Sequence, residues 1–204
     1  MYVRTVYATG DPALIDQALA GLRAEAVGLL TSQPGYRGYG LFVDRTLGKI
    51  EMGSWWESEQ AERDSDQQLR VRRAALLAPF AGTTATDVWE AAVFAPPGEV
   101  GPGAGFRLVR ADFDPAQAEP LVSAFRETAL PALEAMPGFV TGALLVRRAE
   151  GRAQVGVIFA DQASLAASRT PQAQARAKAV AASGITVRSL EEFEVVLLDR
   201  PAQH

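Results

Sequence analysis

The chain repeats itself, and this repeat constrains the fold more than any other feature of the sequence. Residues 3–65 align with residues 106–168 at a constant offset of 103 without a gap, and 17 of the 63 aligned positions are identical. The identities include residues that end helices or form turns: Asp11-Pro12 with Asp114-Pro115, Pro34-Gly35 with Pro137-Gly138, and Gly48 with Gly151. Self-similarity at a fixed period is typical of duplicated structural units. The sequence therefore predicts two copies of one fold.

A segment rich in proline and glycine separates the copies. Residues 96–105 contain three prolines and four glycines. Proline cannot donate to a strand ladder and glycine weakens one, so this composition indicates a linker. We therefore predict a first repeat at 1–95, a linker at 96–105 and a second repeat at 106–204.

Each copy has the pattern of a βαββαβ unit. Asp11 and Ser58 stand where helix N-caps belong, and Pro34-Gly35 follows the last apolar residue of the first helical pattern. In the first copy we expect strands at 2–9, 36–45, 49–56 and 86–95, and helices at about 12–30 and 59–81. In the second copy we expect strands at 105–113, 139–148, 152–160 and 186–199, and helices at 114–135 and 161–183, the latter broken near Thr170-Pro171. This order predicts an α+β fold of two ferredoxin-like repeats.

Two strands of the second copy are apolar at successive positions. Residues 155–159 and 195–198 do not alternate with polar residues, and such runs are typical of strands buried on both faces. Helices cover only one face of a ferredoxin-like sheet. We therefore expect the two sheets to face each other, as a pseudo-dimer of the dimeric α/β-barrel type within one chain, with further self-association left open.

Composition excludes several classes of function. The chain has no cysteine, and its single histidine is His204, which argues against disulfides, thiol nucleophiles, Cys-based zinc sites and His-dependent triads. No cluster of carboxylates suggests a metal, and we expect no cofactor. A net charge of -4 gives no basic footprint for nucleic acid. The longest uncharged stretch has 13 residues, too few to span a membrane, and the first residues lack an apolar signal region, so we expect a cytoplasmic protein.

The first copy resembles a known family. Pro34-Gly35-Tyr36-Arg37-Gly38-Tyr39, a predicted hairpin, and the run Trp55-Trp56-Glu57-Ser58-Glu59-Gln60-Ala61 resemble the antibiotic-biosynthesis-monooxygenase type of dimeric α/β barrel. In the second copy Pro137-Gly138-Phe139 survives, but the tryptophan-containing run is replaced. The resemblance implies the fold strongly and the activity weakly. It also implies that a ligand cavity lies between a sheet and its helices.

Polar aromatic residues occur only in the first copy, which holds all four tyrosines and all three tryptophans, while the second holds six of the nine phenylalanines. Such rings suit a flat, partly polar ligand, although buried core aromatics are commoner. Our candidates for binding a small aromatic ligand are Tyr7, Tyr36, Arg37, Tyr39, Trp55 and Trp56.

The facing of these candidates is only partly predictable. Trp55 and Trp56 are adjacent on a strand, so only one can line the cavity. Alternation places Tyr36 on one face with Gly38, Gly40 and Phe42, where the glycines either leave room for a ligand or allow close packing.

One charged pair occurs in both copies. Arg4 and Glu90 correspond to Arg107 and Glu194, and the first and last strands of a ferredoxin-like sheet are antiparallel neighbours. Because the second copy lacks polar aromatics, recurrence favours structural ion pairs, Arg4 with Glu90 and Arg107 with Glu194.

Three hypotheses about function follow. The first is a cofactor-independent monooxygenase or related enzyme that acts on a small phenolic or polycyclic molecule bound in the first repeat. The second is a non-catalytic binding protein with the same cavity. The third is a fold with packed halves that acts through a partner surface. Fold alone does not choose between them.

Overall fold

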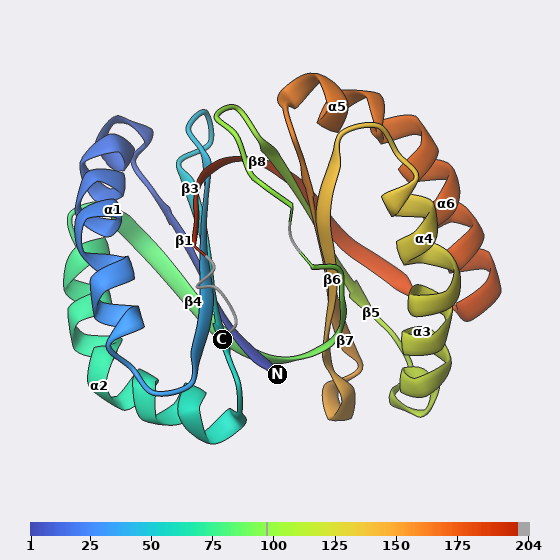
Figure 1. Cartoon of the computed structure of the whole chain (residues 1–204), viewed down its shortest axis with the longest axis horizontal. Helices are drawn as coiled ribbons and strands as arrows, with labels where there is room; N and C mark the ends of the chain where they lie inside the picture. Colours follow the sequence, from blue (N-terminus) through green and yellow to red (C-terminus); the bar gives the residue numbers. More distant parts are fainter. Residues whose placement is uncertain (97, 200–204) are drawn as a thin grey trace. The chain divides into compact units, whose positions relative to one another are not determined.

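A computed structural model describes residues 1–96 and 98–199, without the side chains of residues 182 and 183; His204 lies outside the described residues (Figure 1). The chain divides into two compact units, Met1–Trp89 with Val195–His204, and Glu90–Glu194. These units differ from the sequence repeats, because the last strand of each repeat contributes residues to both. The predicted boundaries of the repeats at residues 95 and 106 therefore stay predictions.

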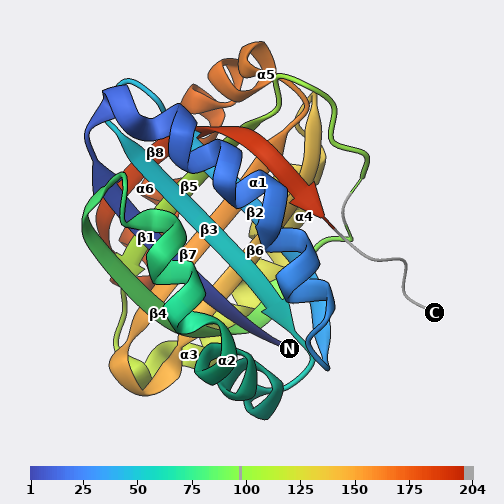
Figure 2. The same ribbon diagram turned by 90° about the vertical axis from the view of Figure 1, so that its left-hand side faces the viewer.

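The first unit is a sheet covered by two helices. Its elements are β1 (Tyr2–Gly10), α1 (Ile15–Thr31), β2 (Tyr36–Asp44), β3 (Lys49–Trp56), α2 (Glu59–Leu77), β4 (Ala81–Phe94, to Trp89 in this unit) and the end of β8 (Thr186–Asp199, from Val195 in this unit). The strand order is β4–β1–β3–β2–β8, and β3 pairs antiparallel with both β1 and β2. Figure 2 shows α1 and α2 lying over one face of these strands.

The predicted helix starts of this unit are confirmed. The Asp11 carboxylate accepts a hydrogen bond from the Ala13 amide at 2.9 Å and begins a short 3-10 turn that leads into α1. The Ser58 hydroxyl accepts one from the Ala61 amide at 3.1 Å and begins α2. Each cap satisfies an amide that has no partner within its helix.

The second unit repeats this plan with a more broken helix layer. Its elements are β5 (Gly105–Asp112), α3 (Ala118–Ala124), a π-helical turn (Phe125–Ala129), α4 (Leu130–Glu134), β6 (Phe139–Arg147), β7 (Arg152–Phe159), α5 (Gln162–Ala167), α6 (Arg169–Ser183) and β8 (Thr186–Asp199). The strand order is β8–β5–β7–β6–β4, and the helices lie on one side of the sheet (Figure 1). Residues 90–94 of β4 pair with β6, and residues 186–194 of β8 pair with β5. The predicted βαββαβ order is confirmed.

Two details differ from the sequence prediction. The break in the last helical region lies at Ser168, so Thr170 and Pro171 stand in the first turn of α6, where proline removes no helical hydrogen bond. β4 begins at Ala81, five residues before the predicted start at Thr86.

The linker is held against the second unit. The Ala95 amide donates to the Gly142 carbonyl at 2.9 Å, and the Gly98 amide donates to the Val140 carbonyl at 3.2 Å. In the described part of the chain, no helix is both long and apolar enough to cross a membrane.

Candidate functional site

A cavity of about 50 Å³ lies between the sheet and the helices of the first unit. Leucines 22, 29 and 30 and Ala26 of α1, with Leu69 and Leu76 of α2, form its apolar wall. Its polar side chains come from all three central strands and from α2: Arg4 (β1), Tyr39 (β2), Ser54 (β3) and Arg73 (α2). A volume of this size holds water, whereas a cavity that binds benzene measures about 150 Å³.

Arg4 is the centre of a buried ion-pair network at this cavity. It is 3% exposed, and its Nη1 donates to Glu62 Oε1 at 3.0 Å and to Asp66 Oδ1 at 3.4 Å. Its Nη2 donates to the Ser65 hydroxyl at 3.0 Å, and its guanidinium lies over the Trp56 ring. Burial and the nearby Arg73 lower the Arg4 pKa from its very high ordinary value. Burial raises the pKa of Glu62, although the Arg4 charge opposes the shift.

Two hydrogen-bond donors of the cavity have no partner among the described residues. The Tyr39 hydroxyl, on a side chain 4% exposed, and Arg73 Nη1 are both buried and unpaired. Arg73 Nη2 meanwhile donates to Asp66 Oδ1 at 2.7 Å. Burial raises the pKa of Tyr39 well above its ordinary value, so its hydroxyl stays protonated at neutral pH and can donate. The arrangement suits a ligand with an anionic or strongly accepting oxygen.

Three of the six candidate side chains lie on the cavity side of the sheet. Tyr39 lines the cavity. Tyr36 and Trp56 lie in the same core and pack edge to face, with their ring centroids 5.8 Å apart. The Tyr36 hydroxyl donates to Asp199 Oδ2 at 2.7 Å, and Trp56 Nε1 donates to the Ser54 hydroxyl at 3.0 Å. Trp56 is therefore the tryptophan that faces the helices.

The other three candidates are not at this cavity. Trp55 is the cross-strand partner of Val3, and Tyr7 is that of Glu51, so both share the opposite face. Arg37 is largely exposed and forms an ion pair with Glu57.

The predicted facing of Tyr36 is wrong, and a β-bulge is the reason. The register of β2 against β3 shifts between Tyr36 and Gly38. Because one extra residue inverts the alternation, Tyr36 and Tyr39 share the helix-facing side, and Gly38, Gly40 and Phe42 take the other. The space at Gly40 holds the Phe42 ring, which lies 2.6 Å from where a Gly40 Cβ would stand. These glycines therefore leave no room beside Tyr36.

The predicted ion pairs are also wrong in their partners. Arg4 pairs with Glu62 and Asp66, and Glu90 instead accepts two hydrogen bonds from Arg148, at 2.7 and 2.9 Å. Glu90 lies opposite Val146 in the second unit, because β4 leaves the first unit after Trp89. Arg107 pairs with Glu192 and not with Glu194, because Glu192 is its direct partner in the β5–β8 register.

Sequence reasoning missed the polar residues that α2 supplies. The candidates predicted from the sequence do not include Glu62, Asp66 or Arg73. Their spacing puts them on one side of the helix with Leu69 and Leu76, and this shared periodicity is the signal that could have found them. Among the described residues, no group of three or more His, Cys, Asp or Glu could hold a metal ion.

Comparisons with known proteins identify relatives without assigned function. No family model matches the chain. It is 26% identical over 197 residues to an uncharacterized protein of Mycobacterium tuberculosis, covering 97% of this chain and 88% of the relative. A second uncharacterized protein of that organism is 26% identical over 198 residues, covering 97% and 84%.

Solved structures share the fold across nearly the whole chain. One, named a "putative monooxygenase", from Lactobacillus acidophilus, has a TM-score of 0.73 at 12% identity and covers 98% of this chain and 95% of its own. An anthrone oxidase-like protein has a TM-score of 0.65 at 13% identity, covering 99% and 93%. A ferredoxin-fold protein of Listeria monocytogenes related to antibiotic biosynthesis monooxygenases has a TM-score of 0.55 at 6% identity, covering 96% and 95%.

At such identities these likenesses show the fold. The chain is an α+β protein of two ferredoxin-like repeats and has the fold of the dimeric α/β-barrel proteins as a tandem pseudo-dimer. The resemblance to antibiotic-biosynthesis-monooxygenase-like proteins is confirmed at this level.

Proposed function

We propose that the first unit binds a small phenolic molecule in its cavity and that the chain is a cofactor-independent monooxygenase, or a related enzyme, acting on that molecule in the cytoplasm. The observation that carries the proposal is the pair of unpaired donors, Tyr39 Oη and Arg73 Nη1, in a cavity that Arg4 also lines and whose other lining residues except Ser54 are apolar. The names of the structural neighbours, monooxygenase and anthrone oxidase-like, support the reaction class.

The chemistry needs only the substrate and oxygen. A phenol has a pKa near 10 in water. Cationic and hydrogen-bond-donating groups lower the pKa of a bound phenol because they stabilise its anion. Arg4, Arg73 and the Tyr39 hydroxyl would supply this stabilisation in a site of low dielectric. The electron-rich anion then reacts with O₂ at a ring carbon: a ring C–H becomes a carbonyl, so that the phenol becomes a quinone, and the second oxygen atom leaves as water.

The size of the cavity bears on the substrate. Its volume of about 50 Å³ is smaller than a benzene-binding cavity, so a ring enters only when side chains move. Met52, which lines the cavity, is unbranched and the most adaptable of these side chains. We therefore propose a single-ring phenol before a polycyclic one.

One observation favours the alternative of a non-catalytic binding protein. Among the described residues, no carboxylate lines the cavity; Glu62 and Asp66 instead accept hydrogen bonds from the lining residues Arg4 and Arg73, at 3.0 and 2.7 Å. A general base must reach the proton that it removes. A protein with this cavity could therefore hold a phenolate without oxidising it.

The test combines binding with oxygen uptake. Phenols whose absorbance reports ionisation are titrated at pH 7 into wild type, Y39F and A26V, with oxygen consumption recorded in parallel; Y7F, which changes a tyrosine on the opposite face, is the control. We expect a bound phenolate with wild type and Y7F, binding at least tenfold weaker with Y39F, and none with A26V, which fills the cavity. Binding without oxygen uptake establishes the alternative, and equal binding by wild type and A26V contradicts the site.

A further inference from the structure

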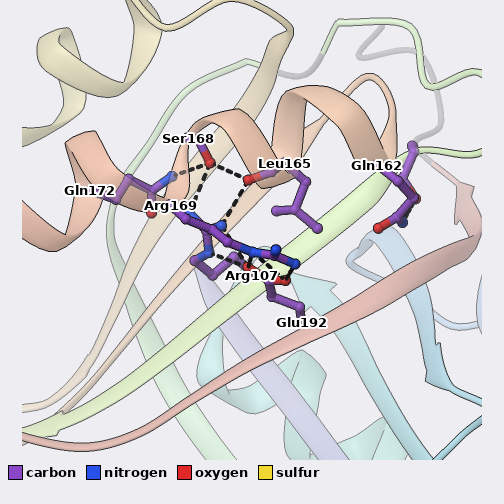
Figure 3. Close-up of polar contacts among 8 residues, drawn as sticks. Arg107, Gln162, Leu165, Ser168, Arg169, Gln172 and Glu192 are labelled. Carbon is purple, nitrogen blue, oxygen red and sulfur yellow. Dashed lines mark hydrogen bonds and ion pairs between the residues drawn. The ribbon is translucent and has the colours of Figure 1, made fainter.

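The second unit contains a group of charged residues that the proposed function does not use. We call it the arginine cluster: Arg107 on β5, Arg169 and Arg176 on α6, and Glu192 on β8. Figure 3 shows Arg107, Arg169 and Glu192 close together beneath the start of α6.

Arg107 organises the cluster from a buried position. It is 1% exposed, and its Nε and Nη2 donate to Glu192 Oε1 at 3.0 and 2.6 Å. Its Nη1 donates to the Ser168 hydroxyl and its Nη2 to the Leu165 carbonyl, both at 2.8 Å. All three guanidinium nitrogens of Arg107 thus donate to protein acceptors, and Arg107 holds Glu192 in place.

Glu192 serves two arginines at once. Its Oε2 accepts a hydrogen bond from Arg169 Nη2 at 2.6 Å, while Oε1 accepts from Arg107. Burial opposes ionisation of Glu192, but the bonds from Arg169 and Arg107 outweigh it, and its pKa lies below the ordinary value. The carboxylate is therefore charged at neutral pH and contributes one negative charge to the cluster.

Arg176 adds a third positive charge without a partner for its buried nitrogen. Its Nη1 has no hydrogen-bond partner among the described residues. Arg176 lies two helical turns after Arg169 and therefore on the same face of α6. Burial and the charge of Arg107 lower its pKa, and the charge of Glu192 opposes this shift. Three guanidiniums around one carboxylate leave an excess of two positive charges.

The equivalent residues of the first unit have no such excess of positive charge. There, Arg4 and Arg73 are balanced by Glu62 and Asp66. Arg176 follows Arg73 by 103 residues, and Arg169 follows Asp66 by the same offset, so an arginine stands where the first copy has a carboxylate.

We propose that the arginine cluster binds a doubly charged tetrahedral oxyanion of the phosphate type, either free or as a monoester, through Arg169 and Arg176. The charge of a phosphate group at neutral pH, about −1.5 to −2, matches the excess. The planar fork of arginine donors suits phosphate oxygens. Arg169 is 63% exposed, which gives an anion access from solvent. Arg107 and Glu192 are positioning residues that orient Arg169.

The test measures anion binding to the full chain by calorimetry and by thermal unfolding. Inorganic phosphate and phenyl phosphate are the probes, and chloride at equal ionic strength is the blank. R176Q removes the unpaired guanidinium. R188Q is the matched control, because Arg188 is also 63% exposed but pairs with Asp112 outside the cluster.

We expect wild type and R188Q to bind phosphate and to unfold at a higher temperature in its presence. R176Q should bind at least tenfold more weakly and, without anion, unfold at a higher temperature than wild type, because the repulsion from Arg107 is gone. Binding of phenyl phosphate alone would assign the site to monoesters, and binding of both would assign it to the phosphate group itself. Equal binding by R176Q and wild type, or no binding of either probe to wild type, overturns the proposal.

Discussion

The two units use the same buried arginine in different surroundings. Arg4 and Arg107 are equivalent in the repeat, and each donates to the hydroxyl of an equivalent serine, Ser65 or Ser168. Each also donates to a helix carbonyl, that of Glu62 or Leu165. The carboxylate partner differs, because Glu62 lies on α2 whereas Glu192 lies on β8.

This difference shows which partners of the arginine are restrained by hydrogen-bond geometry and which are not. The arginine, serine and carbonyl join a strand to a helix through directional hydrogen bonds, so their positions are kept in both units. A carboxylate has only to place its charge near the guanidinium, and a helix or a neighbouring strand can supply it.

The space beside the arginine differs as well. In the first unit Tyr39, Met52 and Ser54 line the cavity. The equivalent positions hold Gly142, Val155 and Val157, and the Phe139 ring lies 3.3 Å from where a Gly142 Cβ would stand. The polar side chains of Tyr39 and Ser54 in the first unit thus correspond to apolar residues in the second.

Removing the arginines should give the largest effect and separate the two networks. R4M leaves Glu62 buried without its cation, and we expect a loss of about 3–5 kcal/mol in the free energy of unfolding at pH 7. R107M should cost less, about 1.5–3 kcal/mol, because Glu192 keeps Arg169. Urea unfolding measures both.

Lowering the pH sharpens this prediction. Without Arg4, burial keeps the folded-state pKa of Glu62 above its unfolded value, so the deficit of R4M should shrink as the pH falls from 7 to about 5. The deficit of R107M should stay nearly constant over this range. Equal deficits at both pH values would mean that Glu62 is not the group left unpaired.

Two equivalent alanines, Ala26 and Ala129, test whether only the first unit has a cavity that can hold a larger side chain. Ala26 lines the cavity, and Ala129, its equivalent, packs against the core of the second unit. We expect A129V to lose about 1–3 kcal/mol by overpacking, whereas A26V should stay within about 1 kcal/mol of wild type. Urea midpoints at constant slope decide this, and equal losses would contradict the difference in packing.

Two tyrosines on β2 should respond in opposite directions. Y36F removes a hydrogen bond to a carboxylate and should destabilise the protein by about 1 kcal/mol. Y39F removes a buried hydroxyl without a protein partner and should stabilise it by up to about 1 kcal/mol. Thermal unfolding of both variants checks the sign, and destabilisation of Y39F would show that its hydroxyl is satisfied.

The smallest effect concerns the pH dependence of the two partner carboxylates. The pKa of Glu192 is lowered on folding, so its contribution is present above its unfolded pKa and is lost as the pH falls. The pKa of Glu62 is raised, so its ionisation costs stability that is regained as the pH falls. Between about pH 7 and 3, E192Q should therefore lose less stability than wild type and E62Q should lose more, each by under about 1 kcal/mol. If the free energy of unfolding changed equally with pH in E192Q and E62Q, the two carboxylates would not differ in the direction of their pKa shifts.

The sequence by itself determined the duplication, the element order and the helix starts. These follow from local signals: Asp11 and Ser58 cap helices through amides two or three residues away, and Pro34-Gly35 ends a helix wherever the chain goes next. The family resemblance that carries the fold also came from contiguous residues. Tyr39 was among the candidates because polar aromatics gather in the first copy.

Only the tertiary structure decided which side chains meet. A single extra residue near Arg37 reversed the facing of Tyr36 relative to the rest of β2. Glycine in a strand is compatible with a bulge, but Gly38 and Gly40 do not by themselves determine where the register shifts. The partners of Arg4 and Arg107 depend on register and on which helix packs above, and these are set by contacts between residues about 60 to 85 positions apart. Periodicity specifies a face within one element, whereas a cavity with Tyr39, Arg4 and Arg73 on its wall exists only when three elements are placed together.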